Sequence, residues 1–94
     1  MRGSKSMSPP QRSRTAAEIG HWLGLTPRQT EVLECVRRDL PDKLIASELG
    51  TSVPTVRAHM KEIFVRLNVH RRQSAAFRWE AASVIKIDDV RSDK

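Results

Sequence analysis

The sequence predicts an all-α fold, a compact four-helix domain with a central helix-turn-helix and a short helix before it. Apolar residues recur at three- and four-residue intervals through most of the chain, and two capping boxes mark helix starts. In the middle of the chain, Gly50 follows the small residue Ala46 by four positions and precedes the β-branched Val56 by six. That spacing is typical of two short helices that meet at a tight turn. No strand pattern appears.

The two ends of the chain differ from its middle in composition. Residues 1–14 are rich in Ser, Pro and basic residues, so we expect a flexible basic arm, of which Met1–Ser4 resembles an expression leader. Thr15 and Glu18 have capping-box spacing, which predicts a short helix or linker helix over residues 15–24. Residues 25–87 should form the helix-turn-helix domain, and residues 88–94 a frayed tail.

The central domain should contain four helices, expected over residues 27–38, 42–50, 53–67 and 72–85. Thr26 and Gln29 form a second capping box at the start of the first of these helices. Ser52 is the expected cap of the third, and Asn68 stands where a left-handed residue would end it. Because each helix has an apolar stripe, the four should pack around one core.

Composition limits the classes of function. The 94 residues carry 17 Lys and Arg against 11 Asp and Glu, a net charge of +6 that favours a polyanionic partner. The single cysteine excludes an internal disulfide, and no apolar run approaches the ~20 residues that span a bilayer. We therefore expect a soluble cytoplasmic protein without a membrane partner.

The outward face of the helix over residues 53–67 is the candidate functional surface. At about 100° per residue, Arg57, Ala58 and Lys61 share one side of this helix. Arg can bind a guanine edge through two hydrogen bonds, and Ala can approach a thymine methyl group. Two cations one turn apart are also typical of an ordinary solvated surface. On the second helix of a helix-turn-helix, however, they predict contacts with the bases of double-stranded DNA.

A second set of residues is expected to contact the DNA backbone, either from the N-terminal turn of this helix or from basic clusters around it. A helix N-terminus favours a phosphate, although capping alone also explains Ser52. The set comprises Lys43, Thr51, Ser52, Thr55, Arg66, Arg71 and Arg72.

The sequence offers no catalytic constellation. His59 has no metal-ligating neighbours at suitable spacing, and the better interpretation is a half-buried, hydrogen-bonded structural histidine. Cys35 fits a small core residue. No Cys/His or Ser/His pair with an orienting acid emerges. We expect no enzyme activity, catalytic residue, metal, cofactor or small-molecule ligand.

The chain resembles the LuxR/NarL (FixJ)-type helix-turn-helix DNA-binding domain of bacterial transcriptional regulators. The resemblance runs from Leu25 to about Trp79. It rests on the run Leu25-Thr26-Pro27-Arg28-Gln29 and on Lys43, Ile45-Ala46, Leu49-Gly50, Ser52, Thr55-Val56-Arg57, His59, Ile63, Leu67-Asn68-Val69, Arg72 and Ala75.

The resemblance implies that the third of the four helices enters the major groove and that Arg57, Ala58 and Lys61 reach bases. It also implies a homodimer through the last helix, formed by Ser74, Phe77, Arg78 and Ala81. A core contact is the alternative for Phe77. Asp39, Leu44, Val65 and Asn68 depart from residues that are common in the family.

The resulting hypothesis is sequence-specific binding of double-stranded DNA by a transcriptional regulator or its effector domain, as a dimer. Two alternatives remain open. One is a protein-interaction module that pairs with full-length regulators and inhibits them, and the other is a promoter-contacting region of a sigma factor. RNA polymerase is a further candidate partner. Steep salt dependence of binding would favour DNA over helix-to-helix pairing.

Overall fold

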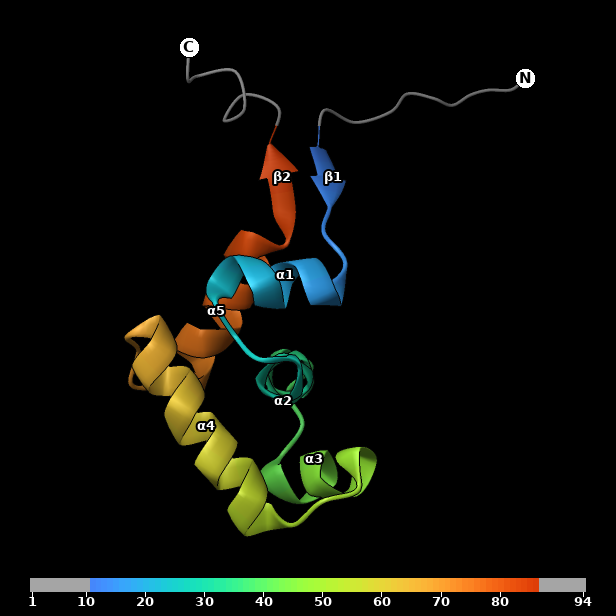
Figure 1. Cartoon of the computed structure of the whole chain (residues 1–94), viewed down its shortest axis with the longest axis vertical. Helices are drawn as coiled ribbons and strands as arrows, with labels where there is room; N and C mark the ends of the chain where they lie inside the picture. Colours follow the sequence, from blue (N-terminus) through green and yellow to red (C-terminus); the bar gives the residue numbers. More distant parts are fainter. Residues whose placement is uncertain (1–10, 87–94) are drawn as a thin grey trace, which may run out of the picture.

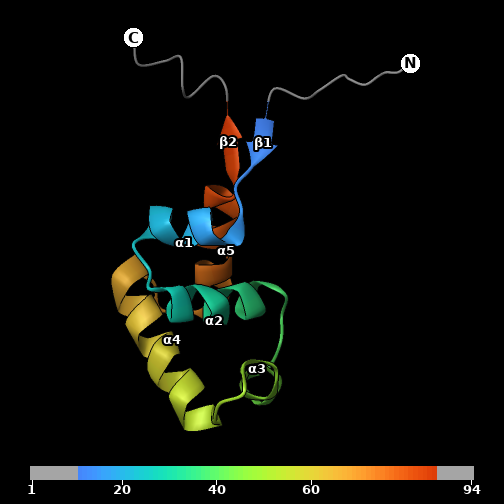
Figure 2. The ribbon, with the colours of Figure 1, turned by 45° about the vertical axis from the view of Figure 1, so that its right-hand side comes forward.

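The computed structural model describes residues 11–86 and confirms the all-α class. Its helices are α1 (Ala16–Leu23), α2 (Pro27–Arg37), α3 (Asp42–Leu49), α4 (Val53–Leu67) and α5 (Arg72–Ala82). Helix α2 lies at the centre and packs against each of the other four helices. Figures 1 and 2 show α1 and α3 on opposite sides of α2, with α4 running along the edge of the molecule. One side of α4 is therefore free.

The predicted capping boxes fix the starts of α1 and α2. The Thr15 hydroxyl accepts a hydrogen bond from the Glu18 N–H, and the Glu18 carboxylate accepts one from the Thr15 N–H at 2.9 Å. Thr26 and Gln29 repeat the arrangement at α2. Each box satisfies N–H groups that have no partner within the helix, so these two starts were predictable from four residues.

The turn between α3 and α4 has the predicted conformation. Gly50 adopts the left-handed region with φ 67°, and the Thr51 N–H donates to the Ala46 carbonyl at 2.9 Å. The Ser52 hydroxyl then accepts from the Thr55 N–H and starts α4. At the other end of α4, Asn68 is left-handed with φ 58°. The helix-turn-helix is thus confirmed at both ends of its second helix.

The inner side of α4 forms much of the core. Its buried residues, Val56, Met60, Ile63 and Leu67, recur every three or four positions and face the buried side chains of α2, α3 and α5. On the opposite side of α2, helix α1 approaches closely at Gly20. A Cβ at Gly20 would lie 1.9 Å from the Thr30 hydroxyl oxygen, so only glycine allows α1 to sit at this distance.

Two short strands extend the fold beyond the prediction. Helix α5 ends at Ala82 rather than near residue 85, and β2 (Val84–Lys86) pairs antiparallel with β1 (Gln11–Ser13). The flexible arm expected over residues 1–14 is therefore wrong for residues 11–13, because the partner strand lies about seventy positions away in the chain, outside any local pattern. Residues 1–10 and the expected tail over residues 88–94 lie outside the described residues.

Arg14 joins this ribbon to the helices. Its N–H donates to the Ser83 carbonyl at 2.7 Å, and its Nη1 donates to the Ala82 carbonyl at 2.6 Å. Its guanidinium also lies 4.3 Å from the centre of the Trp22 ring, a cation–π contact. One arginine thus connects α1, β1 and the end of α5.

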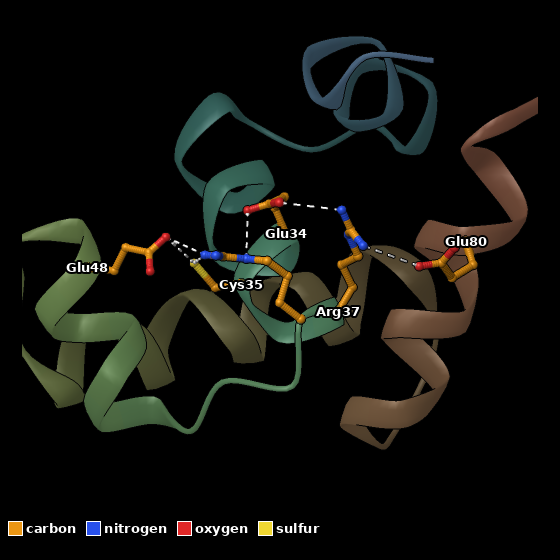
Figure 3. A network of polar contacts seen from close by, with 6 residues as sticks. Glu34, Cys35, Arg37, Glu48 and Glu80 are labelled. Atoms are coloured by element: carbon orange, nitrogen blue, oxygen red, sulfur yellow. Dashed lines mark hydrogen bonds and ion pairs between the residues drawn. The ribbon is translucent and has the colours of Figure 1, made fainter. Parts of the chain in front are cut away.

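A network of polar side chains joins α3, α2 and α5 (Figure 3). Arg38 pairs with Glu48 and Glu34, while Arg37 bridges Glu34 and Glu80. Cys35 beneath it is a core residue, as predicted, and burial raises the pKa of its thiol. The network ties the helix-turn-helix to the last helix through α2.

Candidate nucleic-acid interface

The outward side of α4 is exposed to solvent along its length. Arg57, Ala58 and Lys61 are exposed, opposite the buried stripe of the same helix. The Arg57 side chain is 71% exposed. Sequence periodicity therefore placed these three residues correctly on one free face. A face of this kind carries two cations, one on each side of a methyl group. It can present hydrogen-bond donors to base edges in a DNA groove.

A carboxylate that the sequence analysis missed holds Arg57. Arg57 Nε donates to Asp42 Oδ2 at 3.2 Å, and Arg72 Nη1 donates to Asp42 Oδ1 at 2.6 Å. The Arg72 hydrogen bond is the main reason that the pKa of Asp42 is lowered, with Arg57 contributing further. An Asp in the first turn of a helix is explained by the helix dipole alone, which concealed this second contact in the sequence.

Arg72 has a structural partner as well. Besides its bond to Asp42, its Nη2 donates to the Leu40 carbonyl at 2.7 Å, which joins the start of α5 to the start of α3. Lys43, Arg57 and Arg72 line one shallow hollow of about 510 Å3 beside Asp42. The structure therefore brings three of the predicted DNA-contacting cations together.

The remaining predicted backbone contacts fall at the two ends of α4. Lys43, Ser52 and Thr55 are exposed near its N-terminus, and Thr51 is half-buried beside them. The Ser52 hydroxyl is engaged in capping, because it accepts from the Thr55 N–H and donates to the Thr55 hydroxyl at 3.0 Å.

Arg66 and Arg71 are exposed at the opposite end of α4. Arg66 Cδ lies 3.5 Å from the position that a Cβ at Gly24 would occupy, so its stem runs along the α1–α2 loop. Ala58, Lys61, Val65 and Arg66 line a second shallow hollow, of about 600 Å3. The outward side of α4 is thus bordered by basic residues at both ends.

The residues predicted for the dimer interface share one side of α5. Phe77, Arg78 and Ala81 are exposed, and Ser74 is half-buried. Phe77 is 72% exposed, so the alternative of a core contact is wrong. Arg78 also donates through Nη1 to the Leu67 carbonyl at 2.7 Å. An exposed aromatic ring of this size is a typical anchor of protein–protein contacts.

Several arginines support helix ends, a role that the charge balance could not reveal. Arg28, Arg78 and Arg14 donate to the carbonyls of Leu49, Leu67 and Ala82, the last residues of α3, α4 and α5. Cations are favourable at helix C-termini, where carbonyls lack partners within the helix. Part of the excess positive charge therefore stabilises the fold.

His59 lies at the flank of α4, as expected, with a side chain that is mostly buried. Its Nδ1 has no hydrogen-bond partner within residues 11–86, and the nearest carboxylate oxygen, on Glu62, lies 3.8 Å away. The predicted hydrogen bond is thus not formed at this nitrogen.

Between residues 11 and 86, no group of three or more His, Cys, Asp and Glu side chains could hold a metal ion. None of the helices described above is both long and apolar enough to cross a membrane.

The turn between α3 and α4, and the free cationic side of α4, define a helix-turn-helix protein. Comparison with known proteins then identifies the family, because the luxR family of bacterial regulatory proteins matches residues 23–78. The chain belongs to this family, whose helix-turn-helix members are DNA-binding transcription regulators.

Curated relatives include the nitrate/nitrite response regulator protein NarL of Escherichia coli strain K12. It is 35% identical over 52 residues, which cover 55% of this chain and 24% of the relative. The protein of the same name from Escherichia coli O6:H1 (strain CFT073) gives the same values. The chain thus spans about a quarter of the length of these relatives. No solved structure gives a significant match.

Proposed function

We propose that this chain binds double-stranded DNA sequence-specifically, as a bacterial transcriptional regulator or its effector domain, with α4 in the major groove. The observation that carries the proposal is the free side of α4, where Arg57, Ala58 and Lys61 are exposed opposite a buried apolar stripe. With 15 residues, α4 is roughly 22 Å long, enough to lie along a major groove.

In this proposal the two kinds of contact have separate roles. Arg57, Ala58 and Lys61 contact bases and determine which sequence is bound. Lys43, Thr51, Ser52, Thr55, Arg66, Arg71 and Arg72 contact phosphates and determine register and salt dependence. Because Arg72 already donates to Asp42 and Leu40, it has fewer donors left for a phosphate than Arg71, so we expect it to contribute less.

We further propose that two copies bind paired half-sites through α5. The contact would be formed by Ser74, Phe77, Arg78 and Ala81. These residues recur at intervals of three and four positions and therefore share one side of the helix. The exposure of Phe77 supports this contact, because burying an aromatic side chain against a second copy removes a large apolar area from water.

The exposure of Phe77 also supports the second candidate function, a module that pairs with full-length regulators through α5 and inhibits them. The two candidates differ in their response to salt. Binding to DNA weakens steeply as salt is added because counterions are released from phosphates, whereas apolar helix pairing weakens little.

The test begins with selection of a binding site from a random DNA library, followed by fluorescence anisotropy with that site. Arg57→Ala should weaken binding by about 1–3 kcal/mol, roughly 5- to 150-fold, and relax the preference at one base pair. Arg71→Ala is the matched control, because it should weaken all sequences alike. Unchanged affinity and preference after Arg57→Ala would contradict the recognition face.

A further inference from the structure

Asp42, the first residue of α3, contacts Arg57 on the outward side of α4. Asp42 is only 21% exposed, whereas its partner Arg57 is 71% exposed. The two residues belong to the two helices of the helix-turn-helix and are fifteen positions apart. The Asp42 carboxylate and the phosphates of DNA are both negative and repel each other. A carboxylate beside a DNA-contacting arginine therefore weakens binding unless it also helps the arginine to bind.

The carboxylate itself is held in place from behind. Arg72 donates to Asp42 Oδ1 at 2.6 Å and to the Leu40 carbonyl at 2.7 Å, so its guanidinium joins Asp42 to the backbone just before α3. Asp42 Oδ2 is left to face Arg57. The three side chains together keep a charge of +1, and this corner of the surface therefore still attracts phosphate.

The contact uses one particular donor of Arg57. Its Nε donates to Asp42, while Nη1 and Nη2 form no hydrogen bond within the described part of the chain. These two terminal nitrogens form the fork that binds O6 and N7 of a guanine side by side. A guanidinium held at Nε loses less rotamer freedom when it meets a base, because much of that freedom is already lost in the free protein.

We propose that Asp42 is a positioning residue for base recognition: it holds Arg57 by Nε so that both terminal nitrogens point at a guanine. This inference rests on the proposed DNA-binding function and adds to it a residue of α3 that contacts no base itself. The contact persists when DNA is bound, since it occupies no donor that the base requires.

The central test compares base preference in a double-mutant cycle with Asp42→Asn, Arg57→Ala and the double variant. The Asn side-chain oxygen can still accept from Arg72 Nη1, so the link that supports the fold is kept. Its amide N–H2, however, faces Arg57 Nε donor to donor. Asp42→Asn should lower the ratio of affinities for the selected guanine and a substituted base roughly 5-fold or more. In the Arg57→Ala background the same change should leave that ratio unaltered.

The matched control is Asp39→Asn. Asp39 lines the same hollow as Asp42 and Arg57, and its left-handed backbone, φ 65°, suits Asn. This variant removes one negative charge at the same corner and leaves the Asp42–Arg57 contact in place. It should raise affinity for all sequences slightly and leave base preference unchanged. An equal loss of preference in both variants would overturn the inference, because charge alone would then explain it.

A measurement on the unaltered protein covers the case in which Asp42→Asn does not fold. The NMR signal of the Arg57 Nε–H should stay observable and protected from solvent exchange when DNA is added. Loss of that signal on binding would show that Arg57 leaves Asp42, which would overturn the inference.

The outcomes also separate the two proposals. If Arg57→Ala abolishes base preference and Asp42→Asn does not change it, the positioning role is wrong and the DNA-binding proposal stands. If neither variant changes base preference, Arg57 does not read a base, and both proposals fail for this face of α4.

Discussion

Helices α4 and α5 each leave one side free, and the two sides differ in chemistry. The free side of α4 carries Arg57 and Lys61 on either side of Ala58. The free side of α5 carries Phe77, a large ring that is 72% exposed, among small and polar residues. Behind both helices lies the same core, built largely on α2.

The difference indicates two kinds of partner. Cations are well hydrated, so the α4 side is stable in water and gains only from a partner that supplies negative charge. Exposure of an aromatic ring to water is unfavourable, and burying the ring against another apolar surface lowers the free energy. The α5 side therefore favours an apolar partner surface. On this basis α4 would select DNA and α5 another protein chain, and variants should separate the two.

The largest expected effect should remove both activities at once. Ile63 is fully buried on the inner side of α4, and Ile63→Ala should cost about 2–5 kcal/mol of unfolding free energy, much of the stability of a domain this small. Chemical denaturation followed by circular dichroism measures it. The control is Val65→Ala on the outer side of the same helix, 79% exposed, which should change stability by less than about 0.5 kcal/mol. A similar cost for both would mean that the two sides of α4 are wrongly assigned.

The next effect should separate the sides. Phe77→Ala should weaken self-association and cooperative binding to paired half-sites by about 1–2 kcal/mol, because an aromatic anchor is lost from the contact. Binding of one copy to a single half-site should be unchanged. Sedimentation equilibrium and anisotropy on one and two half-sites measure these quantities. Leu44→Ala, which removes an exposed apolar side chain from α3, is the control. Equal cooperativity in the wild type and Phe77→Ala would exclude the α5 side as the dimer contact.

A smaller effect should come from the support of α5. Arg14→Ala removes a hydrogen bond to the Ala82 carbonyl and the contact with Trp22, and should cost about 1 kcal/mol of stability. Because this support lies at the end of α5, base preference should not change. Arg28→Ala removes a similar bond to the end of α3, at the Leu49 carbonyl, and is the matched control. Hydrogen exchange should show faster opening at the end of α5 only in Arg14→Ala.

The parts of the fold that sequence predicts well depend on neighbouring residues. The starts of α1, α2 and α4 each follow from a hydroxyl residue and a partner three positions later, as at Thr15 and Glu18. The turn at Gly50 follows from the conformational freedom of glycine. The free side of α4 follows from the helical period alone, because the buried stripe determines which residues face outward.

The parts that sequence could not predict depend on residues far apart in the chain. The β1–β2 pair and the Arg14 bond to Ala82 join positions about seventy residues apart, and no local pattern marks either strand. The same holds within the candidate site. Arg57 was predictable from its helix, but its partner Asp42 belongs to the preceding helix, and Arg72 reaches it from α5. Which side chains meet across helices depends on packing, which a periodic pattern does not specify.

The smallest expected effect is a pH dependence of stability that comes from the contacts of Asp42 with Arg57 of α4 and Arg72 of α5. Because Arg72 and Arg57 lower the pKa of Asp42 below its ordinary 3.8, the unfolded chain takes up a proton there before the folded one does. The stability that these contacts add is therefore present above pH 3.8 and is lost as the pH falls through the lower, folded value.

Asp42→Asn should flatten the dependence of the unfolding free energy on pH in this range. The change should be less than about 1 kcal/mol, since the pair with Arg57 is largely exposed. Arg72→Gln should flatten it more than Arg57→Ala, because the Arg72 hydrogen bond is the larger cause. The reverse order, in denaturation curves between pH 7 and pH 3, would show that Arg57 rather than Arg72 holds the carboxylate.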